Sequence, residues 1–162
     1  MSQRTQSIMF FLSALLFAVL FFVPLAEYFG ELNILRFNVF GVESLMPDGA
    51  IPFGKMFALP VLILTVTAVL LGAYLSISLV KAVKMAQFQK LHSIALIDIV
   101  VVVAWIAVVY AYYIRAVGKP ILAEPRFKVG VFLPLLALLL VMLGAGSLKK
   151  DIKKVRSMDR IR

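Results

Sequence analysis

One carboxylate lies inside an otherwise uncharged apolar stretch, and it is the residue best placed to do chemistry. Asp98 comes five residues after Ser93, where a long apolar run begins. A carboxylate within a membrane-spanning segment is rare and points by default to a proton or ligand site. However, Asp98 would lie only about 7 Å from the helix start, where the helix dipole and a nearby cation would stabilise the carboxylate. This shallow position favours a structural ion pair with Arg4, Lys81 or Lys84.

Other chemistry finds little support in the residue types present. Cysteine is absent and His92 is the only histidine, so a zinc site or a bis-histidyl haem cannot be assembled. No phosphate loop, HExxH or GxSxG motif occurs. We therefore predict that the protein is not an enzyme and has no catalytic residues, cofactor or metal. An enzyme acting on quinone or lipid would need a convergent cluster drawn from Arg4, Asp98, Arg115 and Glu124.

The elements that position these residues follow from hydropathy. The 162 residues are 63% hydrophobic and 15% charged, with a mean hydropathy of +1.03, which is far more apolar than a soluble domain. Four apolar runs of about 20 residues each match the length of a membrane-crossing helix. The sequence predicts an all-α integral membrane protein, a four-transmembrane-helix bundle forming one domain over 1–162. Its expected spans are approximately 7–26, 56–80, 93–114 and 129–148.

The connections between these spans differ in character. The first run could be a signal peptide, but it lacks a convincing cleavage pattern before residue 26, so we expect a retained span. The connection at 27–55 contains alternating residues at 35–39 followed by turn residues, which is compatible with a short β-ribbon in this first external loop. The connection at 115–128, broken by glycine and proline, predicts an ordered loop.

Charge distribution predicts the orientation. Eleven of the 17 Lys and Arg residues lie at the two termini and in the middle connection, 81–92. The positive-inside rule therefore places both termini in the cytoplasm. The net charge of +9 is explained by this distribution, and we expect no DNA binding.

Two further patterns indicate contacts. Ala68, Gly72 and Ser76 form a strip of small residues along the second span, where another helix can approach closely. The tail, 149–162, is basic and weakly amphipathic, and it should contact anionic lipid or, alternatively, a partner such as ribosomal RNA. Its basic residues are Lys149, Lys150, Lys153, Lys154, Arg156, Arg160 and Arg162.

The two ends of the chain also carry a family resemblance. The Gln3-Arg4-Thr5-Gln6 start, the segment 130–135 beginning Gly-Val-Phe-Leu-Pro, and the tail 148–162 resemble an uncharacterised family of four-span proteins of Bacteroidetes-type bacteria, catalogued as a domain of unknown function. The resemblance covers essentially the full length. It implies an inner-membrane protein and carries over no activity and no site residue.

These features lead to two hypotheses of function. The first is a non-enzymatic accessory or scaffold subunit of a larger inner-membrane complex of the export, insertase or respiratory type. Its partners would be other membrane subunits and anionic lipids. The alternative is a small transporter, or a lipid- or quinone-binding protein, that uses Asp98 and a polar cavity reaching it.

Overall fold

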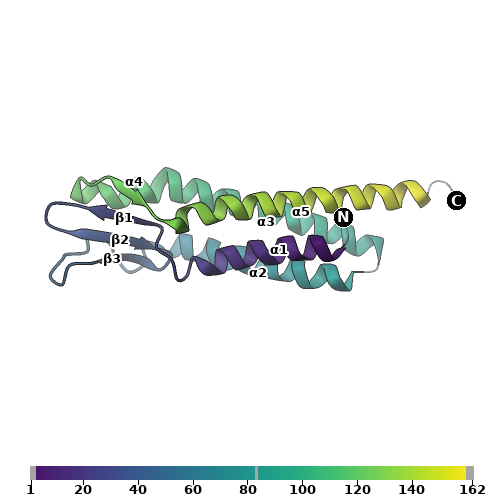
Figure 1. Ribbon diagram of the computed structural model, residues 1–162, viewed down its shortest axis with the longest axis horizontal. Helices are drawn as coiled ribbons and strands as arrows, with labels where there is room; N and C mark the ends of the chain where they lie inside the picture. The colour runs from purple at the N-terminus through teal and green to yellow at the C-terminus, as the bar shows by residue number, and fades with distance from the viewer. Residues whose placement is uncertain (1–2, 83, 160–162) are drawn as a thin grey trace.

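Long helices lie side by side along most of the molecule, and a small β-sheet closes one end (Figure 1). This computed structural model describes residues 3–82 and 84–159. The sheet marks what we call the sheet end, and the start of α1 and the end of α5 both lie at the opposite, terminal end (Figure 1). The elements in chain order are α1 (Gln3–Val19), β1 (Ala26–Phe29), β2 (Ile34–Asn38), β3 (Gly41–Ser44), α2 (Leu59–Lys81), α3 (Met85–Val108), a π-helical turn (Val109–Tyr113), α4 (Ile114–Gly118), a 3₁₀ turn (Lys119–Ile121), β4 (Pro125–Phe127) and α5 (Val129–Asp159).

Within the described residues, three helical segments are long and apolar enough to cross a membrane. They are α2, the helix that begins as α3 and runs on to Ile121, and α5. Helix α1 is not among them, because it ends at Val19 after 17 residues. The predicted span 7–26 is cut short since Ala26 already belongs to β1. The predicted all-α, four-transmembrane-helix bundle is therefore wrong, and three such helices occur with a shorter α1 and a sheet.

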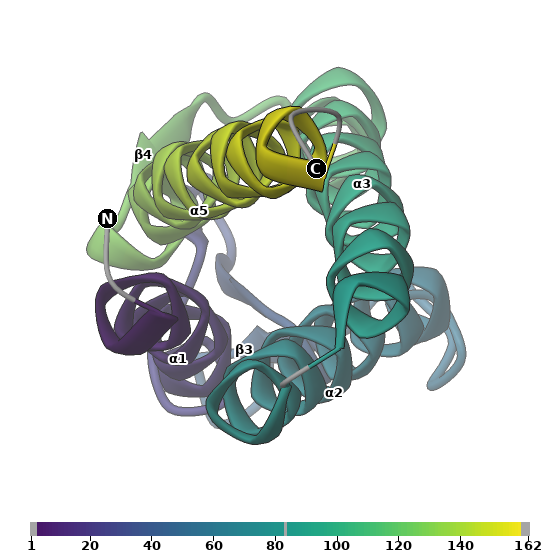
Figure 2. The ribbon, with the colours of Figure 1, turned by 90° about the vertical axis from the view of Figure 1, so that its right-hand side faces the viewer.

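Helix α1 packs closely against α2 and α5 (Figure 2). A Cβ atom on Gly72 would lie 3.0 Å from the Ala14 Cβ and 3.2 Å from the Phe10 carbonyl oxygen. The strip formed by Gly72, Ala68 and Ser76 is buried. Its small side chains allow the backbones of α1 and α2 to approach closely.

One helix extends well past α2 at the sheet end. The helix from Met85 to Ile121 has 37 residues and is about 56 Å long, whereas α2 has 23 residues and is about 35 Å long. A hydrocarbon core is about 30 Å thick. Since the helix from Met85 to Ile121 begins next to the end of α2, its excess length extends at the sheet end.

Residues from both connections build the sheet. It is antiparallel with strand order β3-β2-β1-β4. The alternation at 35–39 correctly indicated a ribbon in the first connection, where Leu35 and Phe37 are buried. The second connection, 115–128, is not the predicted loop, because its first residues continue the helix and its end forms β4.

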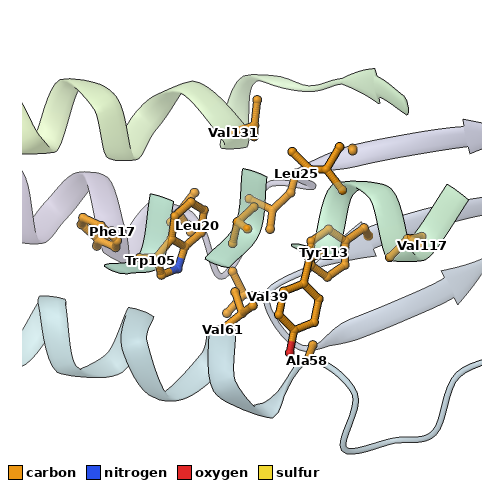
Figure 3. Close-up of a cluster of buried hydrophobic side chains, with 14 of the residues drawn as sticks. Phe17, Leu20, Leu25, Val39, Ala58, Val61, Trp105, Tyr113, Val117 and Val131 are labelled. Carbon is orange, nitrogen blue, oxygen red and sulfur yellow. The ribbon is translucent and has the colours of Figure 1, made fainter. Parts of the chain in front are cut away.

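Aromatic residues join the sheet to the helices. The Tyr28 hydroxyl donates a hydrogen bond to the Ile114 carbonyl oxygen (2.7 Å), and the rings of Phe37 and Tyr113 stack with centroids 5.6 Å apart. Figure 3 shows Tyr113 and Trp105 projecting from the same long helix into this buried cluster. The sheet is therefore an extension of the helical core.

Two glycines of α5 provide a test of this packing. A Cβ on Gly130 would lie 2.5 Å from the Pro24 carbonyl oxygen, whereas one on Gly146 would meet nothing within 4 Å. Gly130→Ala should therefore destabilise the protein by about 1–3 kcal/mol through overpacking. Gly146→Ala should leave stability unchanged or slightly raised. Thermal unfolding in detergent would measure both, and equal midpoints for the two variants would contradict this packing.

Candidate functional site

Asp98 lies deeper in its helix than the sequence suggested. Helix α3 begins at Met85 rather than near Ser93, so Asp98 is about 20 Å from the helix start. The dipole of the helix N-terminus acts only over the first turn, so it contributes little there. Asp98 is 1% exposed, and it faces inward together with Ala95 and Val102.

The structure does not bring the expected cations to Asp98. Both of its carboxylate oxygens are buried without a hydrogen-bond partner among the described residues. Arg4, Lys81 and Lys84 are exposed instead. The polar contacts near the terminal end join α1 to α5 instead. The Gln6 amide nitrogen donates to the Ser147 hydroxyl (3.0 Å) and to an Asp151 carboxylate oxygen (2.6 Å).

The burial of Asp98 leads to a stability prediction. An unpartnered buried charge is costly, so the neutral isostere Asp98→Asn should raise stability by about 1–3 kcal/mol at pH 8. The matched control is Asp151→Asn, which weakens a hydrogen bond from Gln6 and should lower stability. Thermal unfolding in detergent measures both variants. A lower midpoint for Asp98→Asn would show that the carboxylate has a partner in the folded protein.

The described cavities do not assemble the cluster that an enzyme would need. One cavity of about 380 Å³ is lined by Arg115, but not by Arg4, Asp98 or Glu124. None of the five cavities described reaches Asp98. Among residues 3–82 and 84–159, no group of three or more potential metal-ligating side chains comes together. The Nδ1 atom of His92 is buried without a partner in the same part of the chain.

The basic tail continues α5 without a break. Helix α5 runs to Asp159, so the expected boundary after residue 148 is not a helix end. Lys150 and Lys154 line a cavity of about 290 Å³ together with Ser147 and Asp151. The other described tail cations, Lys149, Lys153 and Arg156, are exposed. Arg160 and Arg162, also predicted to contact lipid or a partner, lie outside the described residues.

Glu27 forms an ion-paired centre in the sheet, which sequence reasoning missed. Its carboxylate lies 3.0 Å from the Arg36 guanidinium and 2.9 Å from the Lys128 ammonium, and its side chain is 8% exposed. Lys128 and then Arg36 hold the pKa of Glu27 below its usual value, against the opposing effect of burial. The only signal in the sequence was the opposite charge of Glu27 and Arg36, and their pairing depends on strand register.

The strand register extends this pair into a row of alternating charges. Arg126 of β4 lies opposite Glu27 of β1, Glu27 lies opposite Arg36 of β2, and Arg36 lies opposite Glu43 of β3. Residues directly opposite in a sheet share one face, so the four side chains form a single row. The Arg126 guanidinium also lies over the Phe29 ring, 4.7 Å from its centroid.

The ion pairs of Glu27 predict a pH dependence. A carboxylate with a lowered pKa in the folded state stabilises the protein at neutral pH, and this contribution disappears as pH falls through that pKa. Glu27→Gln should therefore destabilise the protein by about 2 kcal/mol at pH 7. The difference from the wild type should shrink steadily below pH 4.5. Unfolding midpoints between pH 7 and 3 measure it, with the exposed Glu31→Gln as a control, and a pH-independent difference would contradict the pairing.

The far tip of the sheet end exposes apolar side chains. Leu32, in the β1–β2 turn, is 91% exposed, and Leu122, before β4, is 95% exposed. Both line one cavity of about 410 Å³ that also includes Phe29, and we call these three residues the tip patch. Leu122 has a φ of 50°, a left-handed conformation that costs a residue with a Cβ about 1–2 kcal/mol. Sequence reasoning missed this patch because it is formed by two separate connections.

Comparison with known proteins gives one match. The profile of a family described as Domain of unknown function (DUF4293) matches residues 2–161. No curated protein and no solved structure matches the chain.

Proposed function

The chain belongs to the DUF4293 family, and from this premise we propose that it is a non-enzymatic accessory or scaffold subunit of a larger inner-membrane complex. The complex would be of the export, insertase or respiratory type. The observation that carries this proposal is the tip patch. Large exposed apolar groups that lie beyond the apolar spans are typical of a surface that another protein covers.

The position of the tip patch supports contact with protein rather than lipid. Exposed apolar residues on α2, α3 and α5 can be covered by lipid chains, but Leu32 and Leu122 lie beyond the apolar spans. The helix from Met85 to Ile121 is about 20 Å longer than α2, and this excess length holds them beyond the start of α2. A strained Leu122 that is almost fully exposed contributes nothing to the core, which favours a role in binding.

Charge supports an orientation with the terminal end in the cytoplasm. The described part of α5 carries Lys149, Lys150, Lys153, Lys154 and Arg156 at that end. Cytoplasmic segments are enriched in Lys and Arg, and such a tail would contact anionic lipid of the inner leaflet. A partner such as ribosomal RNA is the alternative for the tail. The proposal places the protein in the inner membrane of a bacterium of the Bacteroidetes type, with both termini cytoplasmic.

The alternative is a small transporter, or a lipid- or quinone-binding protein, that uses Asp98. The unpartnered burial of Asp98 supports it. However, this hypothesis requires a polar cavity that reaches the carboxylate, and the cavities described are lined by other residues. The tip patch therefore supports the accessory-subunit proposal more strongly.

A variant of the tip patch tests this proposal. Leu32→Ser combined with Leu122→Asn removes the two most exposed apolar side chains of the patch, and asparagine tolerates a positive φ better than leucine does. The tagged protein would be extracted from native membranes in mild detergent, and co-purifying proteins would be quantified by mass spectrometry. We expect a stoichiometric partner with the wild type and a loss of about tenfold or more with the variant, which corresponds to about 1.4 kcal/mol.

The control removes apolar surface of similar kind elsewhere. Leu70 of α2 is exposed on a span, so Leu70→Ala should retain the partner. The thermal unfolding midpoint of the tip variant should be no lower than that of the wild type, because Leu122→Asn relieves strain. A wild-type protein that purifies alone, or a tip variant that retains its partner, would overturn the proposal.

A further inference from the structure

The row of charges that crosses the sheet ends with opposite charges at the two sheet edges. Strand β3 lies at one edge and carries Glu43, and β4 lies at the other and carries Arg126. We propose that copies of this chain associate head to tail, with β4 of one copy pairing with β3 of the next. The row of alternating charges would then continue across the junction.

Strand β3 has backbone groups that point toward its open edge and could form this junction. The Leu45 N–H donates to the Ile34 carbonyl oxygen (2.9 Å), so this pair is hydrogen-bonded between β2 and β3. In an antiparallel ladder, hydrogen-bonded and non-hydrogen-bonded pairs alternate. The backbone groups of Glu43 therefore point toward β2, and those of Val42 and Ser44 point toward the open edge.

The same alternation determines the open edge of β4. The Lys128 N–H donates to the Leu25 carbonyl oxygen (3.0 Å), and so the backbone groups of Arg126 face β1. Those of Phe127 and Pro125 point outward. Pro125 has no N–H, so this edge offers one donor fewer than an ordinary strand. The association should accordingly be weaker than a pairing of two complete edges.

Placing Arg126 opposite Glu43 fixes the register of the junction. Phe127 then lies opposite Val42, and these two residues exchange both backbone hydrogen bonds. Pro125 lies opposite Ser44, whose N–H can donate to the proline carbonyl oxygen. Arg126 and Glu43 form a non-hydrogen-bonded pair, in which side chains approach most closely and opposite charges contribute about 0.2–1 kcal/mol.

The orientation of the strands suits a membrane protein. Strands β1 and β2, β2 and β3, and β1 and β4 are each antiparallel, so β4 also runs antiparallel to β3. A head-to-tail junction therefore joins copies that have the same orientation in the membrane. A symmetric antiparallel pairing of β3 with β3 would reverse one copy, because the strands run along the long axis of the molecule (Figure 1).

Part of the β3 edge borders a cavity. A cavity of about 390 Å³ lies along it, between residues 40–43 on one side and residues 51–55 on the other. The apolar walls of this cavity, Phe40, Val42, Ile51 and Phe53, could contact Phe127 of the neighbouring copy. Such a heterologous junction builds a ring if its rotation closes, and an open row if it does not.

The absence of cysteine from the sequence makes a cross-linking test clean. Copies carrying Glu43→Cys and copies carrying Arg126→Cys, with different tags, would be co-expressed and oxidised in native membranes. The Cα atoms of a non-hydrogen-bonded pair lie about 4.5 Å apart, within the range of a disulfide. We expect a disulfide-linked pair that contains both tags. In the control, the first copy carries Glu31→Cys, in the β1–β2 turn, in place of Glu43→Cys. The yield of the mixed disulfide should then be at least fivefold lower.

A second pair of variants tests the backbone of the junction. Val42→Pro, added to the Glu43→Cys copy, removes an outward N–H but no bond to β2, whereas Val42→Thr keeps that N–H. The proline variant should lower the cross-linked yield at least fivefold in protein that is still folded, and the threonine variant, which also loses packing of Val42 against the core, should not. Three outcomes would overturn the proposal. They are equal cross-linked yields from the proline and threonine variants, a predominance of Glu43→Cys copies linked to each other, and no mixed disulfide from folded protein. Since the tip patch takes no part in it, these outcomes leave the proposed function untouched.

Discussion

Backbone N–H and C=O groups removed from water must find partners within the protein, and this requirement organises the whole structure. Along the apolar segments, helices satisfy it internally, since hydrocarbon offers no hydrogen bonds. Where the chain leaves the helices, four strands from two connections pair with one another. The hydroxyls of Tyr110 and Tyr113 donate to the carbonyl oxygens of Val131 and Phe57, close to the starts of α5 and α2. Helices and sheet thus form a continuous unit.

Hydropathy predicted the helices well in their middles and less well at their ends. The expected span 56–80 corresponds to α2, Leu59–Lys81. The expected span 93–114 missed the start of α3, because Gln87, Lys90 and His92 lower the hydropathy of a stretch that still forms a helix. The prediction for residues 20–26 was wrong in the opposite sense. These residues are apolar, but they lie beyond the end of α1 and lead into β1. Apolarity alone therefore does not determine where a helix ends.

The candidate site was harder to predict, since it depends on residues distant in the sequence. Strand β4 has only three residues and exists because β1 lies beside it. The partners of Glu27 come from both connections, and so does the tip patch of Phe29, Leu32 and Leu122. The expected pairing of Asp98 relied on a helix start that lies eight residues too late. Local patterns carried no information on these contacts.

The π-helical turn at Val109–Tyr113 sets the rotation of everything beyond it. There the Ile114 N–H bonds to the Val109 carbonyl oxygen, five residues back, so the turn accommodates one residue more than an α-helical turn. Each residue of an α-helix turns the chain by about 100°. Deleting one residue within this turn would leave the Ile114 N–H bonded to the Val109 carbonyl oxygen in an ordinary α-helical turn, so α4 would keep its orientation. Deleting one residue from the regular part of α3 would instead rotate α4 by about 100° and carry the Ile114 carbonyl oxygen away from the Tyr28 hydroxyl.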